Sequence, residues 1–110
     1  SLNLMVSGTE RRLEPYIEVM VFRALQELLG NASRHSHATV VKVYVDVGDT
    51  LIKVSVDDNG KGFDPETVEQ NKSLGLKIIR DRVGMLGGDF DIDTSVGKGT
   101  RVAFSVPTDE

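Results

Sequence analysis

The chain has 110 residues, of which 39% are hydrophobic and 27% are charged, a size and composition typical of one soluble globular domain. Its formal net charge of −4 argues against a direct nucleic-acid binder, because neutralising a phosphate backbone requires a basic face. The absence of cysteine excludes disulfides, thiol nucleophiles and thiolate metal sites, and no hydrophobic run approaches the roughly 20 residues of a membrane helix. We therefore expect a single cytoplasmic domain over residues 1–110, without a secretory signal.

The N-terminal part of the chain predicts a short strand and then a long helix. Leu2, Leu4 and Val6 alternate with Asn3 and Met5, which favours an edge strand that turns at Ser7-Gly8. Pro15 opens a series of hydrophobic residues at helical spacing that continues to about His35. Proline is well suited to the first turn of a helix, where its missing N–H has no partner to lose.

One border of this helix is polar. At about 100° per residue, Glu27, Asn31 and Arg34 lie within roughly 60° of each other beside the hydrophobic stripe. Gly30 sits inside the helix, where glycine costs about 1 kcal/mol relative to alanine. This cost suggests that a close neighbour or a ligand needs the space at residue 30.

The middle of the chain predicts a β-hairpin. Valines alternate with polar or aromatic residues between 39 and 47, and Gly48-Asp49 connects this strand to a second strand over 51–58. In the second strand the hydrophobic side chains share one parity with Asp58, because successive strand side chains point to opposite faces. We therefore expect Asp58 to point inward.

An inward carboxylate at the end of a strand needs hydrogen-bond donors. Burying Asp58 without them is costly, so its position indicates a ligand with an N–H donor. Gly60 and Gly62 follow directly, and glycine allows both positive φ angles and the close approach of a flat ligand. The alternative is an ordinary hairpin turn, because Asp-Asn-Gly is common turn chemistry.

A polar segment and a second helix follow. Residues 64–73 contain one isolated valine, which predicts a mobile loop and suggests a lid. The helix then begins near residue 73 and stops at Gly87-Gly88. Its N-terminus, facing whatever lies beyond Gly75 and flanked by Lys72 and Lys77, predicts an anion site.

Two final strands complete the pattern of elements. They cover 90–94 and 100–106, and the outward row Asp89, Asp91 and Asp93 is typical of a solvated edge. The order of the elements predicts an α+β fold: a two-layer sandwich whose helices pack on one face of a mixed, mostly antiparallel sheet.

Four separated motifs carry the functional hypothesis. Each has an ordinary explanation alone, since a Glu and an Asn one turn apart are often surface neighbours and Gly-x-Gly-Thr often forms a hairpin. The motifs are Glu27-x-x-x-Asn31, Asp58-x-Gly-x-Gly62, Leu74-Gly75-Leu76 and Gly97-x-Gly-Thr100. In this order and spacing they resemble the ATP-binding catalytic domain of sensor histidine kinases, within the GHKL or Bergerat ATPase superfamily that includes gyrase, Hsp90 and MutL. Residues 22–38 and 76–83 are similar to the subfamily containing NarX, DesK, LiaS and DegS.

The resemblance implies ATP and Mg²⁺ as ligands and assigns residues to them. Asp58 would accept the adenine amino group, Asn31 would coordinate Mg²⁺, and Glu27 would either order the metal's waters or assist proton movement as the catalytic residue. Arg34 and His35 would reach phosphate oxygens, although His35 lies nearer the hydrophobic stripe and fits a packed or capping role equally well. The other nucleotide-binding residues that the resemblance implies are Gly60, Lys61, Gly62, Phe63, Gly75, Leu76 and Thr100.

Some residues depart from the family pattern. Ser73 and Ile78 stand where relatives often carry glycine, which makes the second glycine loop poorer than usual. Leu28 and Gly30 stand where many relatives have alanine and threonine. None of these departures removes a chemical group assigned above.

The resemblance also implies the reaction and its partners. The γ-phosphoryl group of Mg-ATP would pass to a histidine on a separate dimerising helical hairpin, and from there to a response regulator receiver domain. His35 and His37 are excluded as that acceptor because both follow directly on the metal-binding helix. We therefore expect a catalytic fragment that lacks the hairpin and the sensor, is monomeric and does not phosphorylate itself, from a homodimeric parent that is either soluble or membrane-anchored.

Three other functions share parts of this pattern. A serine-kinase anti-sigma factor would phosphorylate a partner's serine without any helical hairpin. An ATP-driven clamp of the gyrase type would need a second domain with a phosphate-reaching lysine. A non-enzymatic interaction module would bind the nucleotide and never transfer phosphate.

Overall fold

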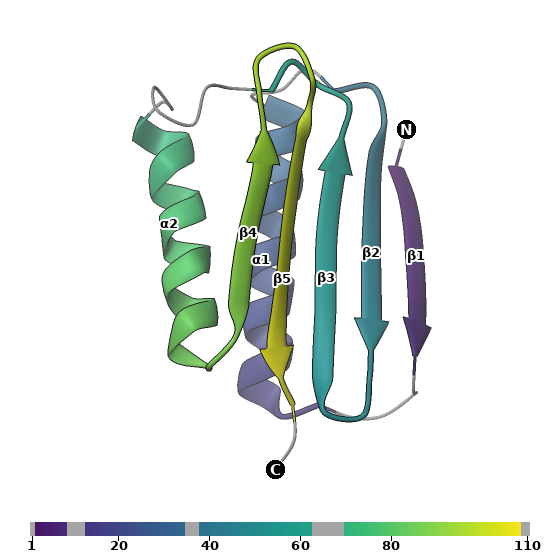
Figure 1. Ribbon diagram of the computed structural model, residues 1–110, viewed down its shortest axis with the longest axis vertical. Coiled ribbons are helices and arrows are strands. Elements are labelled where there is room, and N and C mark those ends of the chain that lie inside the picture. Colours follow the sequence, from purple (N-terminus) through teal and green to yellow (C-terminus); the bar gives the residue numbers. More distant parts are fainter. Residues whose placement is uncertain (1, 9–12, 35–37, 63–69, 109–110) are drawn as a thin grey trace.

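The computed structural model describes residues 2–8, 13–34, 38–62 and 70–108 of the chain, without the side chains of 33, 34 and 70–74. These residues form two helices and five strands, whose arrangement Figure 1 shows. Their bounds are β1 Leu2–Gly8, α1 Pro15–Arg34, β2 Val41–Val47, β3 Leu51–Asp58, α2 Gln70–Met85, β4 Asp89–Thr94 and β5 Thr100–Pro107.

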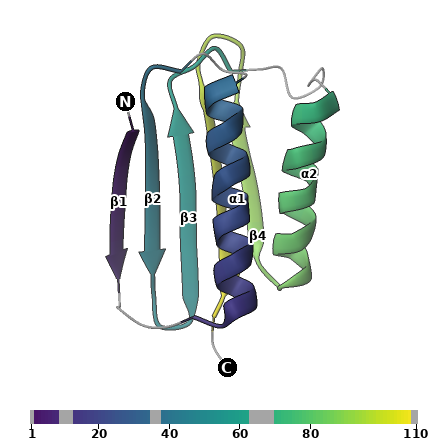
Figure 2. The same ribbon diagram turned by 180° about the vertical axis from the view of Figure 1, so that it is seen from behind.

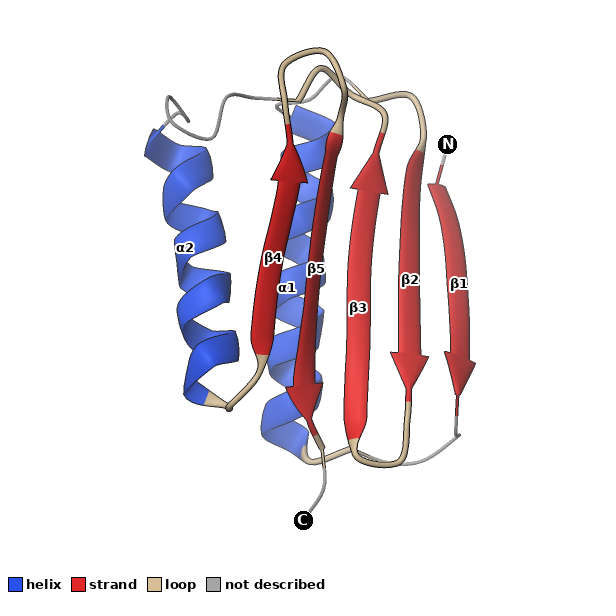
Figure 3. Cartoon of the chain, in the orientation of Figure 1, coloured by secondary structure: helices blue, strands red, loops and turns tan. Residues whose placement is uncertain are grey.

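The strands form one mixed sheet in the order β1-β2-β3-β5-β4. Strands β1 and β2 are parallel, and all other neighbouring pairs are antiparallel (Figure 3). Figures 1 and 2 show from opposite sides that α1 and α2 both lie on one face of this sheet. None of the described helices or loops covers the other face, which we call the open face. The predicted two-layer α+β architecture is therefore confirmed.

The hydrophobic core fills the space between the helices and the sheet. On β3 and β5 the buried side chains alternate with more exposed ones, as the period of a strand requires. Val83 of α2 and Val106 of β5 are completely shielded from solvent. The other core residues are Ile17, Met20, Val21, Ala24, Leu28, Val43, Ile52, Val54, Val56, Leu76, Ile79, Val102 and Phe104.

The two edges of the sheet differ in character. Every residue of β1 is exposed, which confirms the prediction of an N-terminal edge strand. At the opposite edge, β4 presents the exposed carboxylates of Asp89, Asp91 and Asp93, as predicted for a solvated row. Such charges discourage pairing with another strand.

Helix α2 begins earlier than its hydrophobic pattern predicts. It starts at Gln70 rather than near Ser73, so residues 70–73 are helical and not part of a loop. The first turn carries only polar side chains, and hydrophobic periodicity therefore cannot reveal it. The unpaired N–H groups of a helix belong to its first turn, so in α2 they lie in the turn that begins at Gln70 and not at Gly75, where the sequence predicted an anion site. The remainder of the predicted lid, residues 64–69, lies outside the described residues.

The end of α2 agrees with the sequence. Gly87 has a φ of 78°, and the N–H of Gly88 donates to the carbonyl of Val83 at 2.9 Å. A left-handed glycine with such a returning hydrogen bond is a common helix terminator. Along the described ranges, neither helix has the length and hydrophobicity needed to cross a lipid bilayer.

Candidate functional site

The four sequence motifs meet at one end of the molecule. The C-terminal turns of α1, the end of β3, the start of α2 and the turn between β4 and β5 all lie at the upper end of Figure 1. Helix α1 runs towards this end and α2 runs away from it, which Figure 2 shows from behind. The fold therefore brings together segments that are far apart in the sequence.

Asp58 occupies the end of the central strand β3, where its carboxylate is partly buried. It shares its parity with the buried Val54 and Val56, so the side chain lies on the helix-covered face, as predicted. Its neighbour on β5 is Thr100. The backbone N–H of Gly60 donates to the Oδ1 atom of Asp58 at 2.8 Å. The loop that follows β3 therefore holds one oxygen of the Asp58 carboxylate in place.

The two glycine motifs that follow β3 and β4 pack directly on each other. A β-carbon at Gly62, whose φ is 64°, would overlap a carbonyl oxygen of the β4–β5 turn. A β-carbon at Gly99, whose φ is 80°, would overlap the carbonyl oxygen of Asp58. The N–H of Gly97 donates to the carbonyl of Lys61. The contact between the two backbones alone requires glycine at these positions, independently of any ligand.

A pair of threonines closes the β4–β5 turn beside Asp58. The hydroxyl oxygens of Thr94 and Thr100 lie 2.9 Å apart, and the Thr94 hydroxyl donates to the carbonyl of Gly99 at 3.0 Å. The sequence hypothesis gave Thr100 a place in the nucleotide pocket. In the structure its hydroxyl takes part in this local hydrogen-bond network.

Helix α1 contributes Glu27 and Asn31 to the same end. The Oε2 atom of Glu27 lies where a β-carbon at Gly75 of α2 would stand, so the two helices approach closely at this point. The Nδ2 atom of Asn31 is buried, and none of the described residues is its hydrogen-bond partner. Since an unpaired buried amide costs about 1–3 kcal/mol, this atom makes Asn31 a candidate ligand-binding residue.

The remaining predicted site residues fall into two groups. Lys61 is exposed in the loop between Gly60 and Gly62, and Leu76 of α2 packs in the hydrophobic core. The side chain of Arg34, together with all of His35 and Phe63, lies outside the described residues. Their predicted contacts with phosphate or adenine stay predictions.

Sequence reasoning missed Asn59, which lies between Asp58 and Gly60. Its side chain hydrogen-bonds to Thr39 and Val40, just before β2. The only signal in the sequence was an asparagine in turn chemistry, and that signal does not reveal a partner about twenty residues away.

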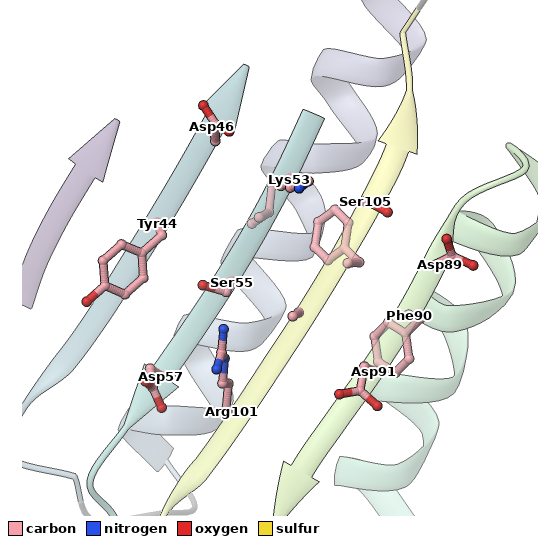
Figure 4. Close-up of a pocket in the computed structure, with 13 residues that line it drawn as sticks. Tyr44, Asp46, Lys53, Ser55, Asp57, Asp89, Phe90, Asp91, Arg101 and Ser105 are labelled. Atoms are coloured by element: carbon pink, nitrogen blue, oxygen red, sulfur yellow. The ribbon is translucent and has the colours of Figure 1, made fainter. Parts of the chain in front are cut away.

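Of the hollows on the surface of the described residues, two large ones differ in their relation to the site. The first, of about 610 Å³, lies on the open face of the sheet between the side chains shown in Figure 4, including Tyr44, Lys53 and Arg101. Asp58 points to the opposite face, so this hollow is separate from the candidate site. The second, of about 600 Å³, runs between α1 and α2 and reaches Glu27 and Gly75.

Few carboxylate or imidazole groups at the candidate site are available to a metal ion within the described part of the chain. No cluster of three or more His, Cys, Asp or Glu side chains able to hold a metal ion occurs among the described residues. Mg²⁺ typically binds through one or two protein oxygens, several waters and the phosphates of a nucleotide. The Asn31 amide, whose Nδ2 atom has no partner among the described residues, and the neighbouring Glu27 carboxylate fit that mode.

Comparisons with known proteins agree with this geometry. Residues 17–110 match the family described as histidine kinase-, DNA gyrase B-, and HSP90-like ATPase. The chain is 38% identical over 100 residues to the signal transduction histidine-protein kinase/phosphatase DegS of Bacillus subtilis (strain 168), and 36% identical over 91 residues to the sensor histidine kinase LiaS of the same organism. These alignments cover 89% and 83% of this chain, but only 26% and 25% of the relatives, so the chain spans about a quarter of their length.

Solved structures show the same fold. The histidine kinase domain of the blue-light activated histidine kinase from Erythrobacter litoralis EL346 matches with a TM-score of 0.77 at 24% identity. The match covers 97% of this chain and 52% of that chain. The family match, the sheet topology and the convergence of the four motifs lead to one conclusion: the chain belongs to the histidine kinase-, DNA gyrase B-, and HSP90-like ATPase family.

Proposed function

We propose that this chain is the ATP-binding catalytic domain of a two-component sensor histidine kinase. In this proposal it transfers the γ-phosphoryl group of Mg-ATP to a histidine on a separate helical-hairpin domain. The observation that carries the proposal is the meeting of Asp58 and the α1 residues Glu27 and Asn31 at one end of the fold. The similarity to DegS and LiaS supports it.

Asp58 would select the adenine base. Its carboxylate is partly buried on the helix-covered face and already accepts one hydrogen bond, from the N–H of Gly60. A carboxylate can accept several hydrogen bonds, and the exocyclic amino group of adenine is a donor of suitable chemistry. A hydrogen bond to a charged group contributes about 1.5–3 kcal/mol, which is enough to favour adenine over a base without that amino group.

Asn31 would hold the metal and the phosphates. Its Oδ1 atom is an oxygen ligand of the kind that Mg²⁺ prefers, and its buried Nδ2 atom would donate to a phosphate oxygen. Glu27, one turn earlier on α1, would orient waters of the metal or take up a proton. When bound, Mg²⁺ would neutralise the negative charge that develops on the transferred phosphoryl group.

The chemistry asks the protein mainly for positioning and charge neutralisation. The acceptor histidine would therefore come from the helical hairpin, in a homodimeric parent protein, and a response regulator receiver domain would take the phosphoryl group next. We also propose a cytoplasmic location, because the domain depends on ATP. Since the chain spans about a quarter of its relatives' length, we propose the hairpin and the receiver domain as partners outside this chain.

A titration of the chain with ATP tests the site. Asp58→Asn should weaken ATP at least about tenfold with or without Mg²⁺, since it removes the charged acceptor. Asn31→Ala should remove mainly the part of the affinity that depends on Mg²⁺. Asp57→Asn is the matched control, because it makes the same change on the next residue of β3, whose side chain lies on the open face. If Asp58→Asn and Asn31→Ala both bind like wild type, the site is wrong.

Transfer requires a second experiment. The domain joined to a helical hairpin that carries the acceptor histidine should label that histidine from ATP labelled in the γ position, and Glu27→Gln should slow the labelling. ATP binding without any labelling would instead favour the non-enzymatic interaction module, and labelling of a partner's serine would favour the anti-sigma kinase.

A further inference from the structure

Asn59 makes four hydrogen bonds to a single short segment of the chain. Its Oδ1 atom accepts the backbone N–H groups of Thr39 at 3.0 Å and Val40 at 2.9 Å. Its Nδ2 atom donates to the hydroxyl oxygen of Thr39 at 3.0 Å, and its backbone N–H donates to the carbonyl of Val40 at 3.2 Å. The donors and the acceptor of one asparagine are therefore all directed at two consecutive residues.

These hydrogen bonds join two parts of the candidate site. Asn59 follows the last residue of β3 and begins the loop that contains Gly60 and Gly62. Thr39 and Val40 lie between α1, which carries Glu27 and Asn31, and β2. Asn59 therefore fastens the loop beside the Asp58 carboxylate to the connection that follows the helix proposed to bind the metal.

The position of Asn59 also controls the hydrogen bond that holds Asp58. The N–H of Gly60 donates to the Oδ1 atom of Asp58, and this bond spans Asn59. Rotation of the backbone at residue 59 would carry the N–H of Gly60 away from the carboxylate. Because glycine at residue 60 offers little resistance to such rotation, the side-chain bonds of Asn59 supply the restraint.

We propose that Asn59 is a positioning residue that orients the Asp58 carboxylate for the adenine amino group through its hydrogen bonds to Thr39 and Val40. This inference rests on the proposed function, in which Asp58 binds adenine. Asn59 itself touches no nucleotide in this account. Asn59 limits the orientations of the Asp58 side chain before the nucleotide binds. Less conformational entropy is then lost on binding, and such preorganisation increases affinity.

The role depends on the chemistry of the asparagine side chain and not on packing. Asn59 is exposed, so its removal leaves the hydrophobic core intact. Aspartate at this position would keep an oxygen for both backbone N–H groups, and the Thr39 hydroxyl can donate to its second oxygen. Alanine would lose all three side-chain bonds. Asn59→Asp should therefore preserve the function that Asn59→Ala removes.

Hydrogen exchange of the chain without nucleotide tests the restraint directly. In Asn59→Ala the amide of Gly60 should exchange about tenfold faster than in wild type, the effect of losing roughly 1.4 kcal/mol of local stabilisation. In Asn59→Asp it should stay within about threefold of wild type. Asn3→Ala, the same substitution at an exposed position of β1, is the control and should leave Gly60 unchanged. Unchanged exchange of Gly60 in Asn59→Ala would overturn the proposal.

A comparison of ATP with inosine triphosphate separates positioning from a general structural role. Inosine triphosphate has a carbonyl where ATP has the amino group, so it lacks the donor proposed to bind Asp58 and places an acceptor there instead. Asn59→Ala should weaken ATP about tenfold while changing the affinity for inosine triphosphate less than about twofold, and Asn59→Asp should restore the preference for ATP. An equal loss for both nucleotides would show a merely structural role and would overturn the proposal.

Titrations of wild type and Asp58→Asn with the same two nucleotides distinguish the positioning role of Asn59 from the proposed adenine-binding role of Asp58. If wild type prefers ATP, Asp58→Asn loses the preference and Asn59→Ala keeps it, the positioning role is wrong and the proposed function stands. If wild type shows no preference for ATP, the adenine assignment of Asp58 is wrong, and the proposed positioning role, which depends on it, is overturned as well.

Discussion

The carboxylate of Glu27 in α1 lies against the backbone of Gly75 in α2, in the space that a β-carbon at residue 75 would fill. The family resemblance implied that Gly75 is one of the nucleotide-binding residues. The structure offers a more direct reason for a glycine, since residue 75 is already helical and any side chain there would displace Glu27.

Gly75→Ala should therefore separate folding from function. Alanine stabilises a helix by up to about 1 kcal/mol relative to glycine, and the atom it would meet is the mobile end of a side chain, so the free energy of unfolding should not fall. Displacement of Glu27 should nevertheless slow phosphoryl transfer at least about tenfold, because positioned acid–base groups typically accelerate a reaction roughly 10²- to 10⁴-fold. Denaturant unfolding and single-turnover transfer to an attached hairpin measure the two effects.

Gly84→Ala is the matched control for this experiment. Gly84 lies in the same helix, and a β-carbon there would meet no atom of another element within 4 Å, so alanine should add helix stability without touching the site. Equal transfer rates for the two variants would contradict a role for the space at Gly75.

Gly62→Ala should destabilise the fold through a collision between two backbones. Gly62 has a positive φ, which costs a residue with a β-carbon about 1–2 kcal/mol, and its β-carbon would also overlap the carbonyl oxygen of Ser95. Gly97→Ala has a similar φ cost but meets no atom within 4 Å. Urea unfolding should therefore show that Gly62→Ala loses at least about 1 kcal/mol more than Gly97→Ala. Equal losses of unfolding free energy in the two variants would mean that Gly62 does not pack against the β4–β5 turn.

Local patterns in the sequence predicted most of the fold. The alternation of β3 correctly placed Asp58 on the helix-covered face, because that inference needs only the period of a strand. The first turn of α2 escaped prediction because residues 70–73 carry no hydrophobic signal. The contacts of Gly62 with the β4–β5 turn and of Asn59 with Thr39 join distant segments, and their partners become visible only when the sheet is assembled.

Two valines on the helix-covered side of the sheet should respond very differently to truncation. Val6 of β1 is 65% exposed, whereas Val43 of the neighbouring strand β2 is 3% exposed, because the helices do not cover β1. Val43→Ala should cost about 2 kcal/mol of the free energy of unfolding, and Val6→Ala less than about 0.5 kcal/mol. Thermal or denaturant unfolding of both variants checks this difference. A cost for Val6→Ala as large as that for Val43→Ala would mean that another surface covers β1 in solution.

We expect Asn31 to bind the ligand at a cost to the stability of the chain without nucleotide. Its Nδ2 atom is buried without a partner among the described residues, and leucine has nearly the same shape without the unsatisfied donor. Asn31→Leu should therefore raise the free energy of unfolding by about 1 kcal/mol, helped by the better helix propensity of leucine.

The same substitution should abolish the Mg²⁺-dependent part of ATP binding, because leucine offers neither an oxygen to the metal nor an N–H to a phosphate. Gln26→Leu, at an exposed position of the same helix, is the control for adding leucine and should leave ATP binding unchanged. Unfolding without nucleotide and calorimetric titration with and without Mg²⁺ measure the two effects. A variant that loses stability and keeps its Mg²⁺ dependence would show that the Asn31 amide serves the fold, and the metal site would then have to be sought elsewhere at this end of the sheet.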